Sequence, residues 1–550
     1  MDKKPRNIIF GERVQRAIDE GVSKTYRAVA TTLGSKGRNV GIEKNWGAPL
    51  IIHDGVTVAR EVVLKDPFAN MAAQQVIYAA QKTNDQAGDG TTTAVVLTHA
   101  IVQEGLKQIA AKVNPQILRK GIERATAVVV AELQKMATKV SSFDEMKQVA
   151  SISAASDSLG ELIARAIEKV GEHGVVSVQE GTSTTIEVEY KEGMDFPQGR
   201  ISPYMVTDLE RDEAVLKGSG ESRPFIALVD QELNNDDLFN KILNPLSTFN
   251  KSATIVIIAN DFDADAKSTL VVNRIRASKL YIGVKSPEYG EHRTNMLHDI
   301  AKLTGATVIG GSSGIPFSSV ALEHFGRAEK AIVNKEQTMI IGGAGDKKEI
   351  AKHITGIRKL MKTTKTEFIK DKLEARLAKL VGGVAVISVG ANSEAEMREL
   401  KERVYDAVNA TQAALELGIV PGGGVALLRA SVVLDKLKES PESIGIKIVR
   451  DALMYPLIKL VDNAGGNSGH VLETIKKDAD KNMGYNVNSE AFENMLTSGI
   501  IDPVKVTISA LKNASSTATM LLTMDCMISL ERDNPTEQSM SMEGIGSFAN

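Results

Sequence analysis

A Gly-Asp-Gly turn followed by three threonines lies between two runs of helical spacing, in AGDGTTTAVV at residues 87–96. The free N–H groups that open a helix suit an anionic phosphate, and the hydroxyls of Thr91, Thr92 and Thr93 would add neutral donors. The carboxylate of Asp89 would repel a phosphate unless a hard cation such as Mg2+ lies between the two. The rival interpretation is an ordinary helix cap, a role that Asp and Thr often fill. Taken alone, the turn favours the cap.

Other glycine-rich turns with polar neighbours change this balance. Asp54 in HDG would by itself be read as a turn residue. The turns and carboxylates that join it are TLGSKGRN (32–39), PGGGVAL (421–427), MGYN (483–486), IIDP (500–503) and Asp406 in RVYDAVNAT. Together they provide a glycine loop with room for a ligand and several carboxylates, so a nucleotide site becomes the better interpretation.

The sequence lacks the motifs of the common nucleotide-binding folds and of zinc hydrolases. No Gly-Lys-Ser or Gly-Lys-Thr ends a P-loop, and no GxGxxG follows an expected strand. No HExxH occurs and the 8 histidines are scattered, which argues against a zinc hydrolase. The nucleotide would therefore be bound by none of the usual ATPase or dinucleotide folds.

The composition of the chain is that of a protein with several domains. Its 550 residues suggest about three domains, at roughly 100–200 residues each. A net charge of -3 gives no reason to expect a nucleic acid or an anionic membrane as partner. The single cysteine, Cys526, excludes an internal disulfide, and no apolar run is long enough for a signal peptide or a membrane span. We expect a cytoplasmic protein, or one in an equivalent reducing compartment.

Local patterns predict a nested layout. Residues 11–33 have helical spacing with Gly34 as a C-cap. NVGIE and LIIHDGVTVARE look like strands, with turns at Trp46-Gly47 and Asp54-Gly55, and helices follow to about Lys139. From Thr182, short β-branched runs predict an α/β domain, and helical spacing returns from Arg403 to the end. The α/β part would thus be inserted into a helical domain that both ends of the chain build. Gly193 and Gly382-Gly383 would be hinges at the crossings, or ordinary turns.

The ordered motifs TLGSKGRNV, HDGVTVARE, AGDGTTTAVVL, GGVAVISVG, RVYDAVNAT, PGGGVALLR and GIIDPVKV resemble the group I chaperonins of the GroEL type, of which this chain would be a divergent member. The resemblance covers essentially the whole chain. It implies a multidomain α and α/β fold: a helical equatorial ATPase domain (1–135 and 417–550), a small hinged intermediate domain (136–191 and 385–416) and an inserted α/β apical domain (192–384). The nested layout agrees with this.

The resemblance also implies the roles of individual residues. Asp89 would hold Mg2+, Asp406 would activate the attacking water when the intermediate domain closes, and Asp54 would assist near the γ-phosphate. The other residues implied to bind ATP are Thr32, Leu33, Gly34, Ser35, His53, Gly90, Thr91, Thr92, Thr93, Gly423, Asn486, Val487, Asn488 and Asp502. K+ is a further expected cofactor.

Two amphipathic segments, DDLFNKILNPLSTF and DADAKSTLVVNRI, would on pattern alone place their apolar stripes in the core. The resemblance implies instead that part of each stripe binds unfolded polypeptides and the loop of a 10-kDa-type co-chaperonin. The matching residues are Tyr204, Leu243, Leu246, Val271 and Val272. The partners expected from the family are therefore non-native chains, a co-chaperonin and further copies of this chain in a ring, seven-membered in the family.

Several residues depart from the family pattern. Ser35 and His53 replace the usual Pro and Lys beside the phosphates, and Ile458 and Asn467 replace an oppositely charged pair between rings, so a single ring is conceivable. Arg200, Met205 and Lys267 would make the polypeptide groove less apolar and narrow the range of clients.

We therefore expect an ATP-dependent protein-folding chaperonin. The main alternative is a chaperonin-like binding or assembly paralogue with narrowed clientele. A third class, less well matched by the sequence, is a small-molecule kinase.

Overall fold

The computed structural model describes residues 6–43, 49–52, 54–140, 142–154, 156–171, 174–181, 183–209, 211–311, 314–364 and 367–530. These residues fall into two compact units. Unit 1 combines Met1–Glu161 with Tyr405–Asn550, and unit 2 is Leu162–Val404. Both ends of the chain therefore contribute to one unit, and the other is inserted between them. None of the described helices is long and apolar enough to cross a membrane.

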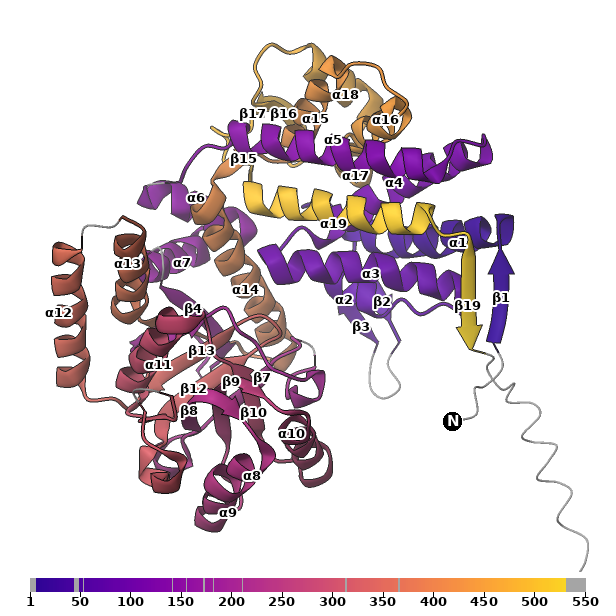
Figure 1. Ribbon diagram of the computed structural model, residues 1–550. Coiled ribbons are helices and arrows are strands. Elements are labelled where there is room, and N and C mark those ends of the chain that lie inside the picture. Colours follow the sequence, from indigo (N-terminus) through magenta and orange to yellow (C-terminus); the bar gives the residue numbers. More distant parts are fainter. Residues whose placement is uncertain are drawn as a thin grey trace, which may run out of the picture. The chain divides into compact units, whose positions relative to one another are not determined.

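Unit 1 is built on long helices with suitable ends. α3 (Pro67–Ala87) begins after Asp66, whose carboxylate accepts from two backbone N–H groups, and ends at the left-handed Gly88. α19 (Val504–Leu522) packs against α3, α4 (Thr91–Ala110) and α5 (Pro115–Met136), as Figure 1 shows. The apolar faces of these helices form the largest core of the unit.

Shorter elements complete unit 1. Its other helices are α1 (Glu12–Val29), α2 (Gly55–Arg60), α6 (Phe143–Ser153), α15 (Val425–Ser431), α16 (Ser443–Ala452), α17 (Tyr455–Asn463) and α18 (Ser468–Lys477). Its strands pair as β1 (Arg6–Phe10) with β19 (Cys526–Leu530), β2 (Val40–Ile42) with β3 (Leu50–Ile52), β15 (Ile419–Pro421) with β18 (Ile501–Pro503), and β16 (Met483–Asn486) with β17 (Ala491–Asn494). Two helices, α7 (Asp157–Val170) and α14 (Glu394–Leu417), contribute residues to both units.

The strand predicted for VTVARE, after the turn at Asp54-Gly55, is wrong, because the chain forms helix α2 there. The Asp54 carboxylate accepts from the N–H groups of Val56 (3.2 Å) and Thr57 (2.7 Å) and caps the helix. This local capping outweighs the β-propensity of the Val-Thr-Val run.

Unit 2 contains two sheets. The larger has the order β10-β9-β8-β12-β13-β6, with β11 beside β8 and β7 beside β12. Its strands are β6 (Gly193–Phe196), β7 (Ala214–Lys217), β8 (Phe225–Leu233), β9 (Ile255–Phe262), β10 (Tyr281–Lys285), β11 (Val308–Ile309), β12 (Gly326–Val333) and β13 (Thr338–Gly343). The smaller has the order β4-β14-β5, with bounds Val175–Glu180, Val384–Val389 and Glu187–Lys191. The expectation of an α/β region inside the chain is confirmed.

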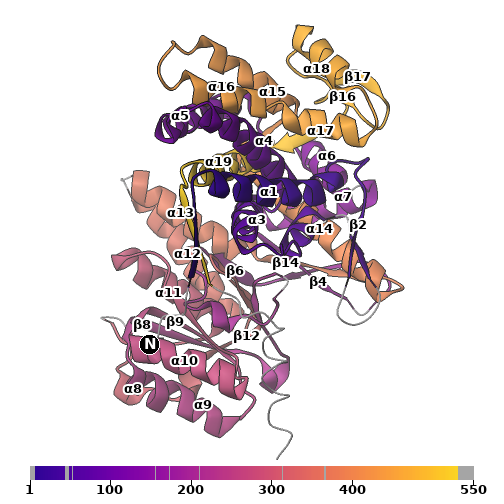
Figure 2. The same ribbon diagram turned by 90° about the vertical axis from the view of Figure 1, so that its right-hand side faces the viewer.

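Helices cover the larger sheet. They are α8 (Asn235–Asp237), a π-helical turn (Leu238–Leu243), α9 (Asn244–Phe249), α10 (Ala264–Ala277), α11 (Gly290–Thr304), α12 (Lys347–Thr363) and α13 (Glu367–Gly382). α10 lies beside α8, and the two can be followed in Figure 2. The segment DDLFNKILNPLSTF is thus not one continuous α-helix, because a π-turn interrupts it just before Pro245.

Candidate functional site

The start of α4 offers backbone N–H groups to a ligand. Gly90 is its N-cap residue, in the left-handed conformation with φ 82°. Because glycine has no side chain, the N-cap residue cannot itself satisfy the first N–H groups of this 20-residue helix. Asp89 is not the cap, and its Oδ1 accepts from the neighbouring Gly90 N–H. The cap interpretation of this turn is therefore wrong for Asp89, and the helix end remains suited to an anion.

Three predicted segments meet at this helix end. The hydroxyl oxygens of Thr32 and Thr92 lie 3.5 Å apart, although sixty residues separate them. A Cβ placed on Gly55 would lie 2.1 Å from the Thr92 hydroxyl oxygen, so only glycine allows the Asp54 turn to approach so closely. Thr91 is buried and Thr93 half-buried. The turns at 32 and 54–55 thus lie directly against the start of α4.

The site carries carboxylates in an unusual electrostatic state. Although Asp89 keeps exposed surface, protein surrounds its carboxyl so closely that desolvation raises the pKa of this group, and the charge of Asp54 adds to the rise. Burial, with a contribution from Asp89, raises the pKa of Asp502 to about 7. None of the described residues forms an ion pair with Asp89. A bound cation would favour the charged form of both carboxylates.

Two further segments contact the turn at residues 32–35. The Ser35 hydroxyl donates to the Asn488 side-chain oxygen (2.7 Å), which brings Asn486, Val487 and Asn488 to the turn at 32–35. Asn463 donates from one amide nitrogen to the carbonyl oxygens of Ala30 (3.0 Å) and Leu33 (2.9 Å). Sequence reasoning missed Asn463, since 430 residues separate it from Leu33 and no local pattern indicates the contact.

The glycine loop of PGGGVAL lies against Asp502. A Cβ on Gly422 would lie 3.0 Å from Oδ1 of Asp502, and one on Gly423 would lie 3.0 Å from the Met495 methyl carbon. Gly423 is left-handed with φ 65°. The pairing of β15 with β18 sets Val420 opposite Asp502 and holds this arrangement.

α14 brings Asp406 into the same region of unit 1. A Cβ on Gly88 would lie 2.1 Å from Cβ of Asn409, so α14 touches the turn that carries Asp89. Asp406 is half-buried and precedes Asn409 by three residues, hence on the same side of the helix. Asn409 was missed, although its spacing from Asp406 was a usable signal. His53 lies outside the described residues.

The expected polypeptide-binding residues divide into two groups. Tyr204 (63% exposed) and Val272 (44%) lie on the surface of unit 2, and Val271 is half-buried. Leu243 and Leu246 instead lie in the core of the larger sheet. For these two leucines the pattern-based expectation of a core position is the correct one. Exposed apolar neighbours on the same helices are Phe239, Phe249 and Ile275.

Two departures from the family pattern do not alter this surface. The Arg200 guanidinium is almost fully buried and pairs with Asp212, and Met205 is buried in the core. Lys267 pairs with Asp261 at 3.4 Å, next to Lys285 at 2.9 Å from the same carboxylate. Arg200 and Met205 therefore give no reason to expect a less apolar surface, and the argument for a narrow clientele now depends on Lys267 alone, whose side chain is 40% exposed.

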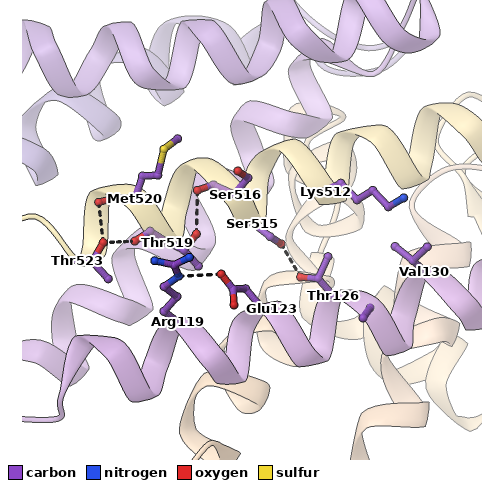
Figure 3. A pocket seen from close by; sticks show the side chains of 11 residues that line it. Arg119, Glu123, Thr126, Val130, Lys512, Ser515, Ser516, Thr519, Met520 and Thr523 are labelled. Atoms are coloured by element: carbon purple, nitrogen blue, oxygen red, sulfur yellow. Dashed lines mark hydrogen bonds and ion pairs between the residues drawn. The ribbon is translucent and has the colours of Figure 1, made fainter.

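A separate groove lies between α5 and α19. It has a volume of about 660 Å3 and is lined by hydroxyl side chains, with Arg119 bonded to Glu123 and Thr126 bonded to Ser515 (Figure 3). None of the expected nucleotide residues lines it. The candidate site is accordingly the start of α4 and not this groove.

Comparison with known proteins agrees with the fold and the motifs. Residues 26–532 match the model of the TCP-1/cpn60 chaperonin family. The chaperonin gp146 from the bacteriophage EL 2 (Pseudomonas aeruginosa), crystallised in the presence of ATP-BeFx, is 23% identical, and the match covers 96% of this chain and 99% of that one. The TM-score is 0.68 for its crystal form II and 0.62 for form I.

Proposed function

Because this chain belongs to the TCP-1/cpn60 chaperonin family and has a chaperonin's folding function, we propose that it drives protein folding by ATP hydrolysis at the start of α4. One observation carries this proposal: the 20-residue helix α4 opens with N–H groups that its N-cap glycine leaves unsatisfied, beside the carboxylates of Asp89 and Asp502, neither of which forms an ion pair with another described residue. Phosphates would accept from those N–H groups and from the threonine hydroxyls. The structure of gp146 was obtained with an ATP analogue, which supports the same proposal.

Asp89 would hold Mg2+. This ion often takes one or two carboxylates from the protein and completes its shell with phosphates and water. When bound, Mg2+ would neutralise charge on the phosphates. Asp406 would orient and deprotonate the attacking water, and Asp54 would assist. The proposal includes K+ on the family resemblance alone.

We further propose the domain division given by the resemblance: equatorial 1–135 and 417–550, intermediate 136–191 and 385–416, apical 192–384. In the apical part, non-native chains and a co-chaperonin loop would bind to Tyr204, Val272 and the exposed Phe239, Phe249 and Ile275. A cytoplasmic or similarly reducing location would keep the exposed Cys526 as a thiol.

Ring formation has support in two small sheets of unit 1. The pairs β1–β19 and β2–β3 are both two-stranded and leave strand edges unpaired among the described residues. Their exposed apolar side chains include Phe10 (62%), Ile51 (69%) and Leu530 (57%). Unpaired edges of this kind favour pairing with another chain, and a head-to-tail contact closes into a ring. We therefore propose a homo-oligomeric ring, with seven members as in the family.

The experiment is to measure ATP turnover and refolding of an aggregation-prone client with the wild type and Asp406→Ala. We expect turnover to fall by about 10^2-fold or more, since a general base contributes about 10^2 to 10^4. Glu399→Gln, which alters an exposed carboxylate on the same helix, is the matched control. Equal turnover in Asp406→Ala and the wild type would contradict the proposal.

The same assay separates the alternative, an assembly paralogue with a narrow clientele. That protein would hydrolyse ATP with the same dependence on Asp406 but would not refold generic clients. Particle images show whether a ring forms in either case.

A further inference from the structure

Helix α12 differs in charge from the rest of the chain. Its 17 residues, KKEIAKHITGIRKLMKT, contain six lysines and arginines but a single acidic residue, Glu349, whereas the whole chain has a net charge of -3. The six are Lys347, Lys348, Lys352, Arg358, Lys359 and Lys362. The net charge of the whole chain therefore conceals a local excess of positive charge on this helix.

These six side chains lie on the solvent side of α12. The helix packs on α13 (Figure 1), with Ile357 buried against two leucines of α13 and Ile350 buried on the same side. At 3.6 residues per turn, the six cations fall within about 140° of the helix circumference, on the opposite side. All six are exposed, and only the small residues Ala351 and Thr355 lie among them. We name the six side chains the cationic stripe.

The charges of the cationic stripe repel one another along the helix. Lys348 and Lys352 are four residues apart, a spacing at which like charges destabilise a helix, and Arg358 and Lys362 form a second such pair. Exposed residues at this spacing on other helices have opposite charges; examples are Arg16 with Glu12, Lys24 with Glu20, Arg119 with Glu123 and Lys477 with Glu473. α12 thus departs from the arrangement that stabilises the other exposed helices.

Few carboxylates compensate the cationic stripe. Lys347 lies 3.2 Å from Glu192 and Lys352 lies 3.8 Å from Glu349, but these two lysine side chains are 84% and 80% exposed. The other four cations form no ion pair with another described residue. Lys347 and Lys348 also stand in the first turn of α12, where the positive end of the helix dipole disfavours a cation. An anion bound to the stripe would relieve both kinds of repulsion.

The side chains of the stripe indicate which kind of anion fits. No aromatic or large apolar side chain lies on it, and the exposed Leu360 lies on the side of Glu349, outside the stripe. An anionic membrane would require apolar side chains that insert, and a protein interface is usually centred on aromatic or apolar anchors. The bases of a single strand would stack on aromatic side chains. A regular polyanion that offers only its backbone phosphates fits best.

The length of the stripe suits a duplex. At 1.5 Å per residue, Lys348 and Lys362 are about 21 Å apart along the helix, which corresponds to about six base pairs at 3.4 Å each. Because Ala351 and Thr355 are small, a phosphate backbone can approach the helix closely between the cations.

We propose that the cationic stripe of α12 binds the phosphate backbone of double-stranded nucleic acid, without regard to base sequence. Lysines and arginines that neutralise phosphates release the counterions condensed on a duplex, so the affinity falls steeply with salt. The binding requires neither ATP hydrolysis nor the apolar surface of unit 2. It is therefore a second function beside the proposed folding reaction.

Fluorescence anisotropy tests the proposal with the full-length protein and labelled DNA and RNA duplexes of one arbitrary sequence, at about 50 and about 200 mM salt. The stripe variant combines Lys348→Gln, Lys352→Gln and Lys359→Gln. The control removes the same charge from three exposed lysines of unit 1, by Lys120→Gln, Lys135→Gln and Lys477→Gln. A conservative variant replaces the three stripe lysines by arginine.

We expect the wild type to bind a duplex at least about 10^2-fold more weakly at the higher salt concentration, because about four neutralised phosphates give that dependence. At the lower concentration the stripe variant should bind at least about tenfold more weakly than the wild type, with a salt slope smaller by roughly 2 to 3. Its melting temperature should equal or exceed that of the wild type, since like charges are removed. The arginine variant and the unit 1 control should bind like the wild type.

Equal binding by the stripe variant and the wild type, or an equal loss in the unit 1 control, would overturn the proposal. Tighter binding of a labelled single strand, of polyglutamate or of phosphatidylserine vesicles than of either duplex would also overturn it, because each would assign the stripe to a different partner. The DNA and RNA arms show which duplex is preferred. The assay contains neither ATP nor a client, so its result does not depend on the proposed folding function.

Discussion

Asp299 and Asp230 of unit 2 have cationic partners that Asp89 of unit 1 lacks among the described residues. In unit 2 the buried Asp299 accepts from Arg376 through two bonds (2.7 and 2.8 Å) and contacts the His353 ring nitrogen at 2.6 Å. Asp230, also buried, pairs with Arg293 and accepts from the Thr294 hydroxyl. In unit 1, desolvation raises the pKa of Asp89, which has no cationic partner among the described residues.

This difference distinguishes carboxylates that stabilise the fold from carboxylates that can bind a ligand. A buried carboxylate with an Arg partner holds helices together, as Asp299 joins α11 to α12 and α13. A desolvated carboxylate without a partner costs free energy in the ligand-free protein. Such a cost is reasonable where a bound cation removes it, and perturbed carboxylates of this kind are concentrated at functional sites.

The strongest test replaces Asp89 by Asn. We expect ATP turnover to fall at least about 100-fold, while the melting temperature stays the same or rises, because the variant loses a metal ligand but also an unfavourable charge. Asp66→Ala, at the N-cap of the neighbouring α3, is the comparison, since it should lower stability without abolishing turnover. A large loss of stability in Asp89→Asn would show that the two units do not differ in this way.

The converse variant is Asp299→Ala in unit 2. Removing this carboxylate leaves the Arg376 guanidinium, 12% exposed, without its partner, and we expect a loss of about 3–5 kcal/mol. Denaturant unfolding followed by hydrogen exchange of α12 and α13 measures the effect. Glu349→Ala, at an exposed pair on α12, should change stability by less than about 1 kcal/mol. Equal effects of both variants would contradict a structural role of Asp299.

His99 provides a third case, a half-buried base that desolvation keeps neutral near pH 7. Its ring stacks on Tyr26 at 3.8 Å, and burial lowers its pKa from 6.5 to about 4. The unfolded chain therefore binds a proton between pH 6.5 and 4 that the folded chain does not, so stability falls as the pH falls through this range, by up to about 3 kcal/mol. His99→Phe keeps the stack and should remove this part of the pH dependence. Identical pH profiles of unfolding for both proteins would contradict the assignment.

The smallest expected effect concerns the apolar surface of unit 2. Ile275 is 61% exposed on α10, so Ile275→Ser should leave stability unchanged while it weakens binding of an unfolded client about threefold to tenfold. Titration of a labelled unfolded client measures the affinity. Arg276→Ser, at the exposed neighbouring position, serves as control, and an affinity loss equal to that of the control would exclude Ile275 from the binding surface.

Much of the fold could be predicted because its signals are local. Helical spacing and β-branched runs depend on near neighbours in the chain, and they indicated a helical part interrupted by an α/β part. The C-cap predicted at Gly34 is wrong, because α1 ends at Val29 with Ala30 as its C-cap and a 3-10 turn follows. The prediction of a strand failed at α2, because the carboxylate of Asp54 caps a helix there. It also could not foresee the π-turn before Pro245, which depends on how that helix packs.

The candidate site, like the fold, was predictable only in part. Residue types and motif order, through the family resemblance they carry, predicted which side chains form it, including Asp89, Thr91 and Asp406. Only the tertiary structure decided that Thr32 reaches Thr92, that Ser35 bonds to Asn488 and that Asn463 holds the loop at Leu33. It also decided that Leu243 and Leu246 are core residues and that Arg200 is buried on Asp212. The residue types determine which chemical groups are present. Segments far apart in the sequence pack together and determine how buried each group is and with which groups it pairs, and this decides which charges can bind a ligand.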